Sequence, residues 1–206
     1  MPELLPDAPA DGDHPRPELI EELVESSPVT WIDRMDDRFD QWWGDTFRGN
    51  PDLDRAYYLA SELADFSLIW LLIGAAQGLR SDERDPDAAL RLGVTLLVES
   101  LVVNQGIKRL FKRPRPVAVA PRPYALRKPL TSSFPSGHAS AAFTAAGVLA
   151  QREPDRRVLV YALATFVATS RVHVKIHHLS DVVAGAALGT VFARIATRAW
   201  PLPERA

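Results

Sequence analysis

Residues that could do chemistry are gathered in three short strings of this 206-residue chain. The strings are Lys108 with Arg115 and Pro116, then Pro135, Ser136, Gly137 and His138, then Ser170, Arg171, His177 and Asp181. Their patterns are K-x6-R-P, P-S-G-H and S-R-x5-H-x3-D, and together they hold three cations, two imidazoles and one carboxylate. Cations combined with imidazoles indicate a phosphate site, because phosphoryl transfer needs charge neutralisation, a nucleophile and a proton donor.

The cations suit an oxyanion ligand. Lys108, Arg115 and Arg171 could clamp the equatorial oxygens of a phosphoryl group, since arginine engages phosphate oxygens in pairs. Ser136 and Gly137 precede an alanine-rich stretch that predicts a helix, so backbone N–H groups at its start would point at an anion. Gly137 allows close backbone approach, and the Ser136 hydroxyl can add a donor. Taken alone, the first string also fits a basic turn at a membrane surface, and the second fits a helix cap.

His177 and Asp181 are four residues apart, which predicts that they stack on one face of a helix. The carboxylate could then accept a proton from one ring nitrogen and fix the tautomer. A pair of this spacing also occurs on solvated helix surfaces. Three neighbours have simpler interpretations, because Lys112 and Arg113 fit a membrane border or an attraction to anionic lipid, and His173 fits a membrane interface.

The order and spacing of the three strings resemble the type 2 phosphatidic acid phosphatase (PAP2) superfamily. That superfamily includes lipid phosphate phosphatases, bacterial acid phosphatases and vanadium haloperoxidases. The resemblance covers roughly residues 59–195. It implies that His177 is the nucleophile, supported by Asp181, and that His138 protonates the leaving oxygen and then activates water. It also implies that phosphate is bound by Lys108, Arg115, Ser136, Gly137 and Arg171 and that hydrolysis needs no metal and no cofactor.

Apolar helices are the elements expected to position these strings. Five stretches have no charge or almost none: Phe66–Leu79, Ala88–Ile107, Ala139–Ala150, Val158–Ser170 and Val182–Ala193. Each lacks the polar stripe of a water-facing helix. We therefore expect an all-α, PAP2-like integral membrane bundle of about five transmembrane helices, although several stretches fall below the roughly 20 apolar residues of a full span. A compact soluble bundle is the alternative, because mean hydropathy is only −0.08.

Three regions are expected along the chain. Residues 1–17 are rich in proline and predict a disordered acidic tail, residues 18–58 predict an amphipathic helical arm, and residues 59–200 predict the membrane phosphatase domain. The apolar positions of the arm include Trp31, Met35, Phe39, Trp42 and Trp43. This apolar face suits either a membrane interface or docking onto the body of the protein.

Charge is distributed unevenly. Residues 1–60 contain 15 Asp and Glu against 5 Lys and Arg, whereas the remainder contains 11 against 19. An acidic arm on a basic body can fold back on that body or stay solvated. The acidic arm argues against nucleic-acid binding, and the absence of cysteine excludes disulfides. The three histidines at 173–178 have no second ligand group at metal-binding spacing, so no metal site is expected.

The expected function is hydrolysis of a lipid phosphate or pyrophosphate by a multi-pass enzyme of the cell membrane. Candidate substrates implied by the resemblance are phosphatidic acid, phosphatidylglycerol phosphate, polyprenyl diphosphate and prenyl-linked sugar phosphate. A vanadium-dependent haloperoxidase-like enzyme and a catalytically silent lipid-binding protein are the alternatives. Five spans would place the N-terminal arm on the active-site side. The sequence does not select the lipid, the membrane face or the oligomeric state.

Two glycines indicate how the helices pack. Gly185 and Gly189 are four residues apart, a spacing of small residues that lets helix backbones approach closely in a membrane. We therefore expect them on a packing face.

Overall fold

The computed structural model describes residues 30–203, except for 81, 118–122, 125 and 128–130. All regular elements in these residues are helices, which confirms the all-α prediction. Two compact units make up the chain, Met1–Arg34 and Met35–Ala206, and the larger one holds the three strings. The tail predicted at 1–17 lies outside the described residues, and the division at 58 and 59 stays a prediction.

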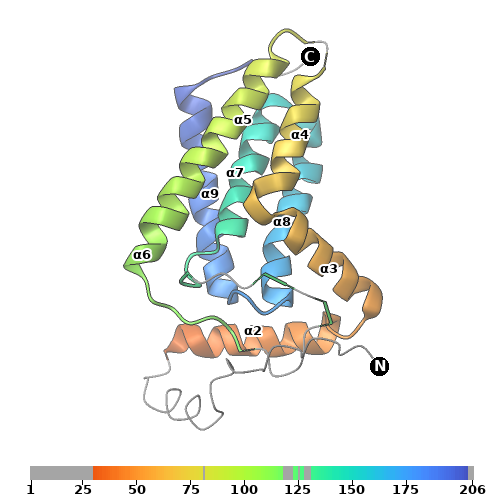
Figure 1. Ribbon diagram of the computed structural model, residues 1–206, viewed down its shortest axis with the longest axis vertical. Coiled ribbons are helices and arrows are strands. Elements are labelled where there is room, and N and C mark those ends of the chain that lie inside the picture. Colours follow the sequence, from red (N-terminus) through yellow and green to blue (C-terminus); the bar gives the residue numbers. More distant parts are fainter. Residues whose placement is uncertain (1–29, 81, 118–122, 125, 128–130, 204–206) are drawn as a thin grey trace, which may run out of the picture. The chain divides into compact units, whose positions relative to one another are not determined.

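Five helices run side by side in Figure 1: α4 (Leu68–Gly78), α5 (Asp85–Ser100), α7 (Gly137–Arg152), α8 (Arg157–His173) and α9 (Leu179–Ala199). They are preceded by α2 (Trp31–Phe47) and α3 (Pro51–Leu63). The shorter elements are η1 (Asp65–Ser67), the π-helical η2 (Leu101–Ile107), α6 (Lys108–Leu110) and η3 (Pro154–Arg156). Four of the five predicted apolar stretches fall in one helix or one continuous helical run, and most of the fifth, Phe66–Leu79, falls in α4, so the expected helices are confirmed.

Close packing of α7 against α9 brings two of the strings to one end of the bundle. A Cβ atom at Gly185 would lie 2.4 Å from the Ser136 carbonyl oxygen, and one at Gly189 would lie 2.2 Å from that of Ser140. The predicted packing role of the two glycines is therefore confirmed. Because the contacts advance in the same direction along both helices, α7 and α9 are parallel and begin at the same end.

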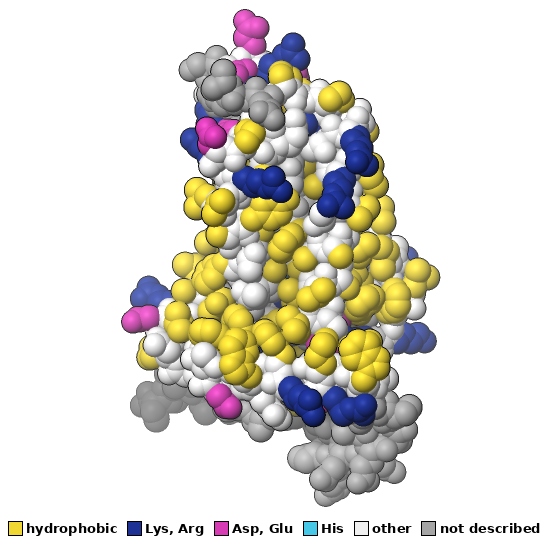
Figure 2. Space-filling model, turned by 180° about the vertical axis from the view of Figure 1, so that it is seen from behind, with side chains coloured by type: hydrophobic (Ala, Val, Ile, Leu, Met, Phe, Trp, Pro, Cys, Tyr) yellow, Lys and Arg dark blue, Asp and Glu magenta, His cyan; other side chains and the backbone are white. Residues whose placement is uncertain are grey.

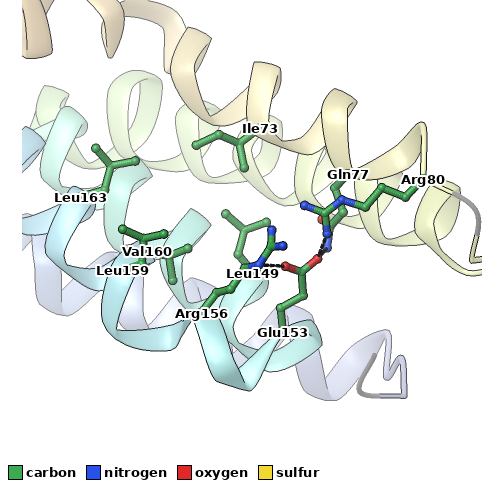
Figure 3. Close-up of a pocket in the computed structure, with 9 residues that line it drawn as sticks. All are labelled: Ile73, Gln77, Arg80, Leu149, Glu153, Arg156, Leu159, Val160 and Leu163. Atoms are coloured by element: carbon green, nitrogen blue, oxygen red, sulfur yellow. Dashed lines mark hydrogen bonds and ion pairs between the residues drawn. The ribbon is translucent and has the colours of Figure 1, made fainter. Parts of the chain in front are cut away.

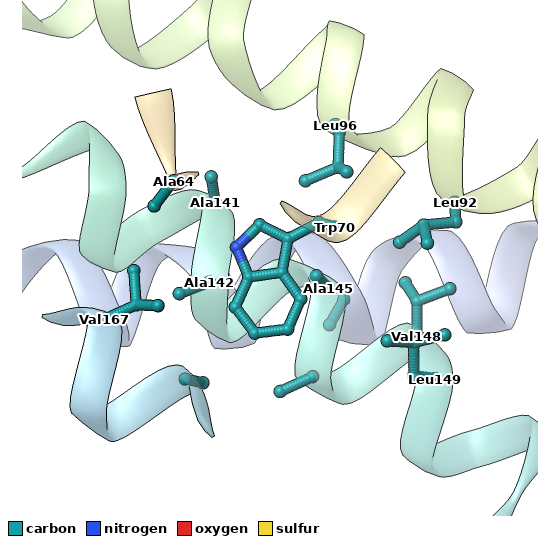
Figure 4. Packing of buried hydrophobic residues seen from close by; sticks show 13 residues of the cluster. Ala64, Trp70, Leu92, Leu96, Ala141, Ala142, Ala145, Val148, Leu149 and Val167 are labelled. Carbon is teal, nitrogen blue, oxygen red and sulfur yellow. The ribbon is translucent and has the colours of Figure 1, made fainter. Parts of the chain in front are cut away.

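The core around α7 depends on small residues and one large ring. Trp70 of α4 is fully buried among leucines of α5 and alanines of α7, as Figure 4 shows. The alanines leave room for the indole, since a larger side chain on α7 would occupy its volume. This contact holds α4 against the helix that carries the P-S-G-H string.

The helical run from α3 to α4 is broken. The two helices meet at an angle of 66°, and the break contains Phe66 and Ser67, whose φ angles of 53° and 61° are left-handed. Of the helices in the described ranges, α9 is long and apolar enough to cross a membrane by itself, and α3 with α4 passes the same test as a bent pair. The number of crossings therefore stays a prediction.

Both the apolar and the acidic side of α2 contribute buried residues. Trp42 and Met35 are exposed, whereas Asp36 and Trp43 are buried. The two interpretations of the apolar face, a membrane interface or docking onto the body, therefore stay predictions, and the acidic side is held by basic and polar partners that the sequence did not indicate. From Met35 onward, α2 belongs to the larger unit.

A groove of about 190 Å³ lies at the other end of α7 (Figure 3). Its mouth is charged, and Glu153 contacts Arg156 at 3.1 Å, Gln77 at 3.2 Å and Arg80. The Glu153 carboxylate is therefore already bonded to the side chains that surround it in the groove. The residues that could do chemistry lie at the opposite end, where α7 begins.

Candidate active site

The first string begins with Lys108 at the end of the helical run formed by α5, η2 and α6, and its Arg115 follows in the non-helical segment between Pro114 and Pro116. Lys108 is buried in the last turn. The Arg115 guanidinium donates hydrogen bonds to the carbonyl oxygens of Ile176 at 2.9 Å, Thr131 at 3.0 Å and Ser132 at 3.2 Å. These bonds tie the first string both to the segment before α7 and to the third string.

The second string forms the start of α7. The Ser136 hydroxyl accepts a hydrogen bond from the Ala139 N–H at 3.4 Å, and the Ser136 N–H donates to the Asp181 carbonyl oxygen at 3.0 Å. A Cβ atom at Gly137 would lie 2.7 Å from Oδ1 of Asn104 on η2. A larger residue at position 137 would therefore clash with Asn104, so glycine is needed there for packing as well as for the close approach of an anion. Ser136 is the N-cap of the helix.

The third string runs from the end of α8, through a tight turn, into the first turn of α9. The Arg171 carbonyl oxygen accepts the His177 N–H at 3.1 Å, and Lys175 reverses the chain with a left-handed φ of 54°. The helix α9 begins at Leu179, so His177 precedes it. The predicted stacking of His177 and Asp181 on one helical face is therefore wrong, because only Asp181 lies within the helix.

Asp181 nevertheless reaches His177 from the first turn of α9. Its Oδ2 lies 3.6 Å from Nδ1 of His177 and accepts the His178 N–H at 2.9 Å. Its Oδ1 accepts a hydrogen bond from NH1 of Arg113 at 2.6 Å. On the far side of the ring, Nε2 of His177 lies 3.4 Å from NH1 of Arg115. The buried imidazole thus lies between a carboxylate with both oxygens bound and a guanidinium.

Three cations act on this imidazole. Burial lowers the pKa of His177 to about 3, and although Asp181 opposes the shift, Arg171, Arg115 and Lys108 add to it. Burial likewise lowers the pKa of Lys108 to about 8, assisted by Arg115 and Arg171. The site therefore combines a neutral ring with positive charges at close range, an arrangement that attracts a multiply charged anion.

His138 has a partner that the sequence did not indicate. Its Nε2 lies 3.0 Å from Oδ1 of Asp65, which precedes the left-handed residues Phe66 and Ser67. Burial lowers the pKa of His138 to about 4, Arg171 adds to this shift, and Asp65 opposes it. Left-handed backbone at non-glycine residues costs on the order of 1–3 kcal/mol each and is often retained at functional sites. The break between α3 and α4 turns Asp65 toward the second string.

One weak feature of the sequence could have indicated Asp65 as a site residue. It is the carboxylate directly before the charge-free stretch Phe66–Leu79, at the point where a helix enters the bundle. No spacing relates it to His138, because the two lie on different helices. Charged residues at the ends of apolar stretches are therefore worth testing as partners of a site.

Two neighbouring residues have partners that the sequence did not indicate. The Arg113 guanidinium bonds Asp181 and also Oδ2 of Asp36 at 2.7 Å, and its place at a membrane border stays a prediction. His173 does not face an interface, because it is buried and its Nδ1 accepts the Trp43 Nε1–H at 3.1 Å. Its Nε2 lies 2.8 Å from Oδ1 of Asp54. Both side chains belong to the packing around the third string.

The phosphate-binding residues expected from the sequence converge at this end of the bundle, together with His177, His138 and Asp181. Within the described ranges, no group of three or more His, Cys, Asp or Glu side chains is placed to hold a metal ion.

Comparisons with known proteins agree with the arrangement. An undecaprenyl-diphosphatase of Sulfolobus acidocaldarius is 33% identical over 105 residues, which make up 48% of this chain and 51% of that protein. The match thus spans about half the length of this relative.

Two solved structures are similar in fold. The transmembrane PAP2 type phosphatidylglycerolphosphate phosphatase from Bacillus subtilis has a TM-score of 0.58 at 21% identity, covering 87% of this chain and 90% of that one. Aquifex aeolicus LpxE has a TM-score of 0.57 at 27% identity, covering 78% and 93%. Residues 88–204 match the PAP2 superfamily over more than half of the chain and include all three strings, so the chain belongs to the PAP2 superfamily.

Proposed function

We propose that this protein is a multi-pass membrane phosphatase that hydrolyses a lipid phosphate or pyrophosphate through a phosphohistidine at His177. The observation that carries the proposal is the position of the His177 ring. Oδ2 of Asp181 lies 3.6 Å behind Nδ1, and NH1 of Arg115 lies 3.4 Å from Nε2. A neutral nitrogen with a carboxylate behind it and cations in front of it is suited to attack an anionic phosphorus centre.

The outer surface of the bundle supports a membrane setting. Large hydrophobic side chains gather over its middle in Figure 2, with Lys and Arg nearer the two ends. Strongly exposed examples are Leu72, Leu97, Leu101, Leu159, Val183 and Ile195. Apolar surface on this scale marks contact with lipid or a partner. The lipid tails of a substrate would then lie beside the helices while its headgroup enters the charged end.

In the first chemical step, Nε2 of His177 attacks phosphorus and the bond to the leaving oxygen breaks. The Asp181 carboxylate, with Oδ2 3.6 Å from Nδ1, favours the proton on Nδ1, which keeps the lone pair on Nε2 and stabilises the positive charge that develops on the ring. Lys108, Arg115 and Arg171 neutralise the equatorial oxygens. The helix start at Ser136 and Gly137 adds its N-terminal dipole to this positive field.

His138 supplies the proton that the leaving oxygen needs. With no anion bound, its pKa of about 4 makes the ring neutral at pH 7. A bound phosphate dianion favours the protonated ring and therefore raises the pKa, so that substrate binding itself charges the acid. Asp65, 3.0 Å from Nε2, orients the ring and stabilises the imidazolium.

In the second step, water attacks the phosphohistidine. His138, neutral after giving up its proton, takes a proton from the water as the new P–O bond forms. The P–N bond breaks, its electron pair returns to Nε2 of His177, and inorganic phosphate leaves. His177 is then again a neutral imidazole, and His138 releases its proton once the phosphate has left.

The substrate class is a lipid with a terminal phosphate or pyrophosphate. The names of the relatives include a polyprenyl diphosphate and a phosphatidylglycerol phosphate as substrates of those proteins. A test panel should contain these two together with phosphatidic acid and a prenyl-linked sugar phosphate. A water-soluble aryl phosphate serves as the substrate without a lipid tail.

The experiment measures phosphate release by the detergent-purified chain on this panel in the presence of EDTA. We expect hydrolysis of at least one lipid, inhibition by vanadate, and no turnover in His177→Ala or Lys108→Ala. Arg109→Ala is the matched control, since Arg109 is exposed and adjacent to Lys108. Turnover preserved in His177→Ala, or abolished by EDTA, would contradict the mechanism. Halide oxidation with added vanadate and no phosphate release would favour the haloperoxidase-like alternative.

A further inference from the structure

Helix α2 lies outside the residues that match the PAP2 superfamily, yet its buried side reaches the catalytic end. Asp36 is 2% exposed. Its Oδ1 accepts the Ser180 N–H at 2.8 Å, and its Oδ2 accepts the Ser180 hydroxyl at 2.6 Å and NH2 of Arg113 at 2.7 Å. A buried carboxylate with three donors is strongly fixed in orientation.

Arg113 connects this carboxylate to the one behind His177. Its NH1 donates to Oδ1 of Asp181 at 2.6 Å and lies 2.6 Å from the Ser180 hydroxyl, while its NH2 binds Asp36. The Arg113 guanidinium is therefore held by two carboxylates, and the Ser180 side chain is bonded to both Arg113 and Asp36. Because the fork of arginine is planar and rigid, moving one of its ends moves the other.

Other side chains of α2 and the segment after it hold the turn from which His177 projects. Oδ2 of Asp40 lies 3.0 Å from Nζ of Lys175, at the left-handed position of the turn. Arg48 donates to the carbonyl oxygens of Val172 at 2.8 Å and of His173 at 3.0 Å. The acidic face of α2 is thus built against the third string along much of its length.

We infer that Asp36 is a positioning residue for the reaction, acting through Arg113 and Ser180 to set the carboxylate of Asp181 behind His177. The inference rests on the proposed function, in which Asp181 fixes the tautomer of the nucleophile. Without Asp36, NH2 of Arg113 and the N–H of Ser180 each lose the carboxylate oxygen that they bind here. The guanidinium then turns, Oδ1 of Asp181 loses its donor, and the carboxylate is free to rotate away from Nδ1.

The variant Asp36→Asn tests this coupling with little change in shape. Its amide keeps one acceptor oxygen, but the second acceptor is replaced by an NH2 group that faces the donors of Arg113 or Ser180. We expect kcat to fall about tenfold with KM changed less than about twofold, because neighbours in one network couple at this scale and the substrate does not touch Asp36. Asp37→Asn is the matched control, since Asp37 is the exposed neighbour on the same helix and removes the same charge.

A double-mutant cycle separates coupling from a general loss of structure. In the Arg113→Gln background, Asp36→Asn should lower kcat by less than about twofold further, because the connection is already broken. Equal losses in both backgrounds would overturn the inference, as would an unchanged kcat in Asp36→Asn. If Asp36→Asn does not fold, Ser180→Ala is the second variant and should lower kcat about threefold at unchanged KM; no effect there contradicts the inference.

A spectroscopic measurement tests the inference without turnover. The chain contains five histidines, so ¹⁵N-histidine labelling with His177→Gln as the assignment variant identifies the His177 ring. We expect the Nδ1–H tautomer in the wild type and a mixed population in Asp36→Asn, with Asp37→Asn unchanged. A tautomer that does not respond to Asp36→Asn overturns the inference. Failure of the wild type to release phosphate, with the tautomer shift present, contradicts only the proposed function.

Discussion

Replacing Arg115 by lysine separates charge from shape at the phosphate site. The variant keeps one positive charge beside His177. It removes the planar fork, whose NH2 holds the carbonyl oxygens of Thr131 at 3.0 Å and Ser132 at 3.2 Å while NH1 holds that of Ile176 at 2.9 Å. A lysine ammonium is a point charge on a flexible stem and cannot occupy both ends of that fork.

The size of the effect follows from these bonds. A lysine ammonium that bonds the Ile176 carbonyl oxygen cannot also bond the carbonyl oxygens of Thr131 and Ser132. Hydrogen bonds to charged groups contribute about 1.5–3 kcal/mol each, and the Thr131 bond is solvent-exposed, so we expect a combined loss of about 2 kcal/mol. If the loss falls on the transition state, kcat/KM decreases about 30-fold.

The assay is phosphate release from the best lipid substrate, with thermal unfolding measured in parallel. Arg109→Lys is the control, because Arg109 is exposed on the preceding turn and bonds only to Gln105 among the contacts described for it. Its kcat/KM should not change. Full kcat/KM in Arg115→Lys would refute the reasoning, since charge alone would then suffice and the orientation of the guanidinium would not matter.

Three further outcomes are expected. Asp65→Asn should lower kcat for lipid substrates about tenfold but have little effect on an aryl phosphate, because a good leaving group does not need a proton from the acid. Gly189→Ala should lower the melting temperature by several degrees, since its Cβ would lie 2.2 Å from a carbonyl oxygen of α7, whereas Gly93→Ala, with open space, should not. Folding lowers the pKa of His177 to about 3 from its ordinary 6.5, so the unfolded chain binds the proton more tightly. Stability should therefore be fully present above pH 6.5 and fall as the pH decreases toward 3, less steeply in His177→Gln.

The helices were predictable because their signal is local. Five stretches with little or no charge and no polar stripe each supply a helix, and the spacing of Gly185 and Gly189 indicated a packing face that the structure confirms. The break at Phe66 was not predictable. Neither Phe66 nor Ser67 favours left-handed backbone, so only the surrounding packing decides that the chain bends there.

The face of α2 was predicted less well. Periodicity indicated an apolar face that suits a membrane interface or docking onto the body of the protein, and it gave no sign that Asp36 is buried. The hydrophobic pattern shows which side of a helix is apolar, and it does not show which side finds charged partners. The contacts that decide the question join Asp36 to Arg113 and Ser180, 77 and 144 residues away in the chain.

The sequence by itself determined the chemical set of this protein: two imidazoles, a carboxylate and three cations at the ends of apolar helices, in the order of the PAP2 superfamily. Such residues are recognisable because their types and their short spacings carry the chemistry. Only the tertiary structure decided which groups support them. Asp65 reaches His138 across a helix break, and Asp36 reaches Asp181 through Arg113. These contacts depend on three-dimensional packing between distant segments, which leaves no period or spacing in the chain.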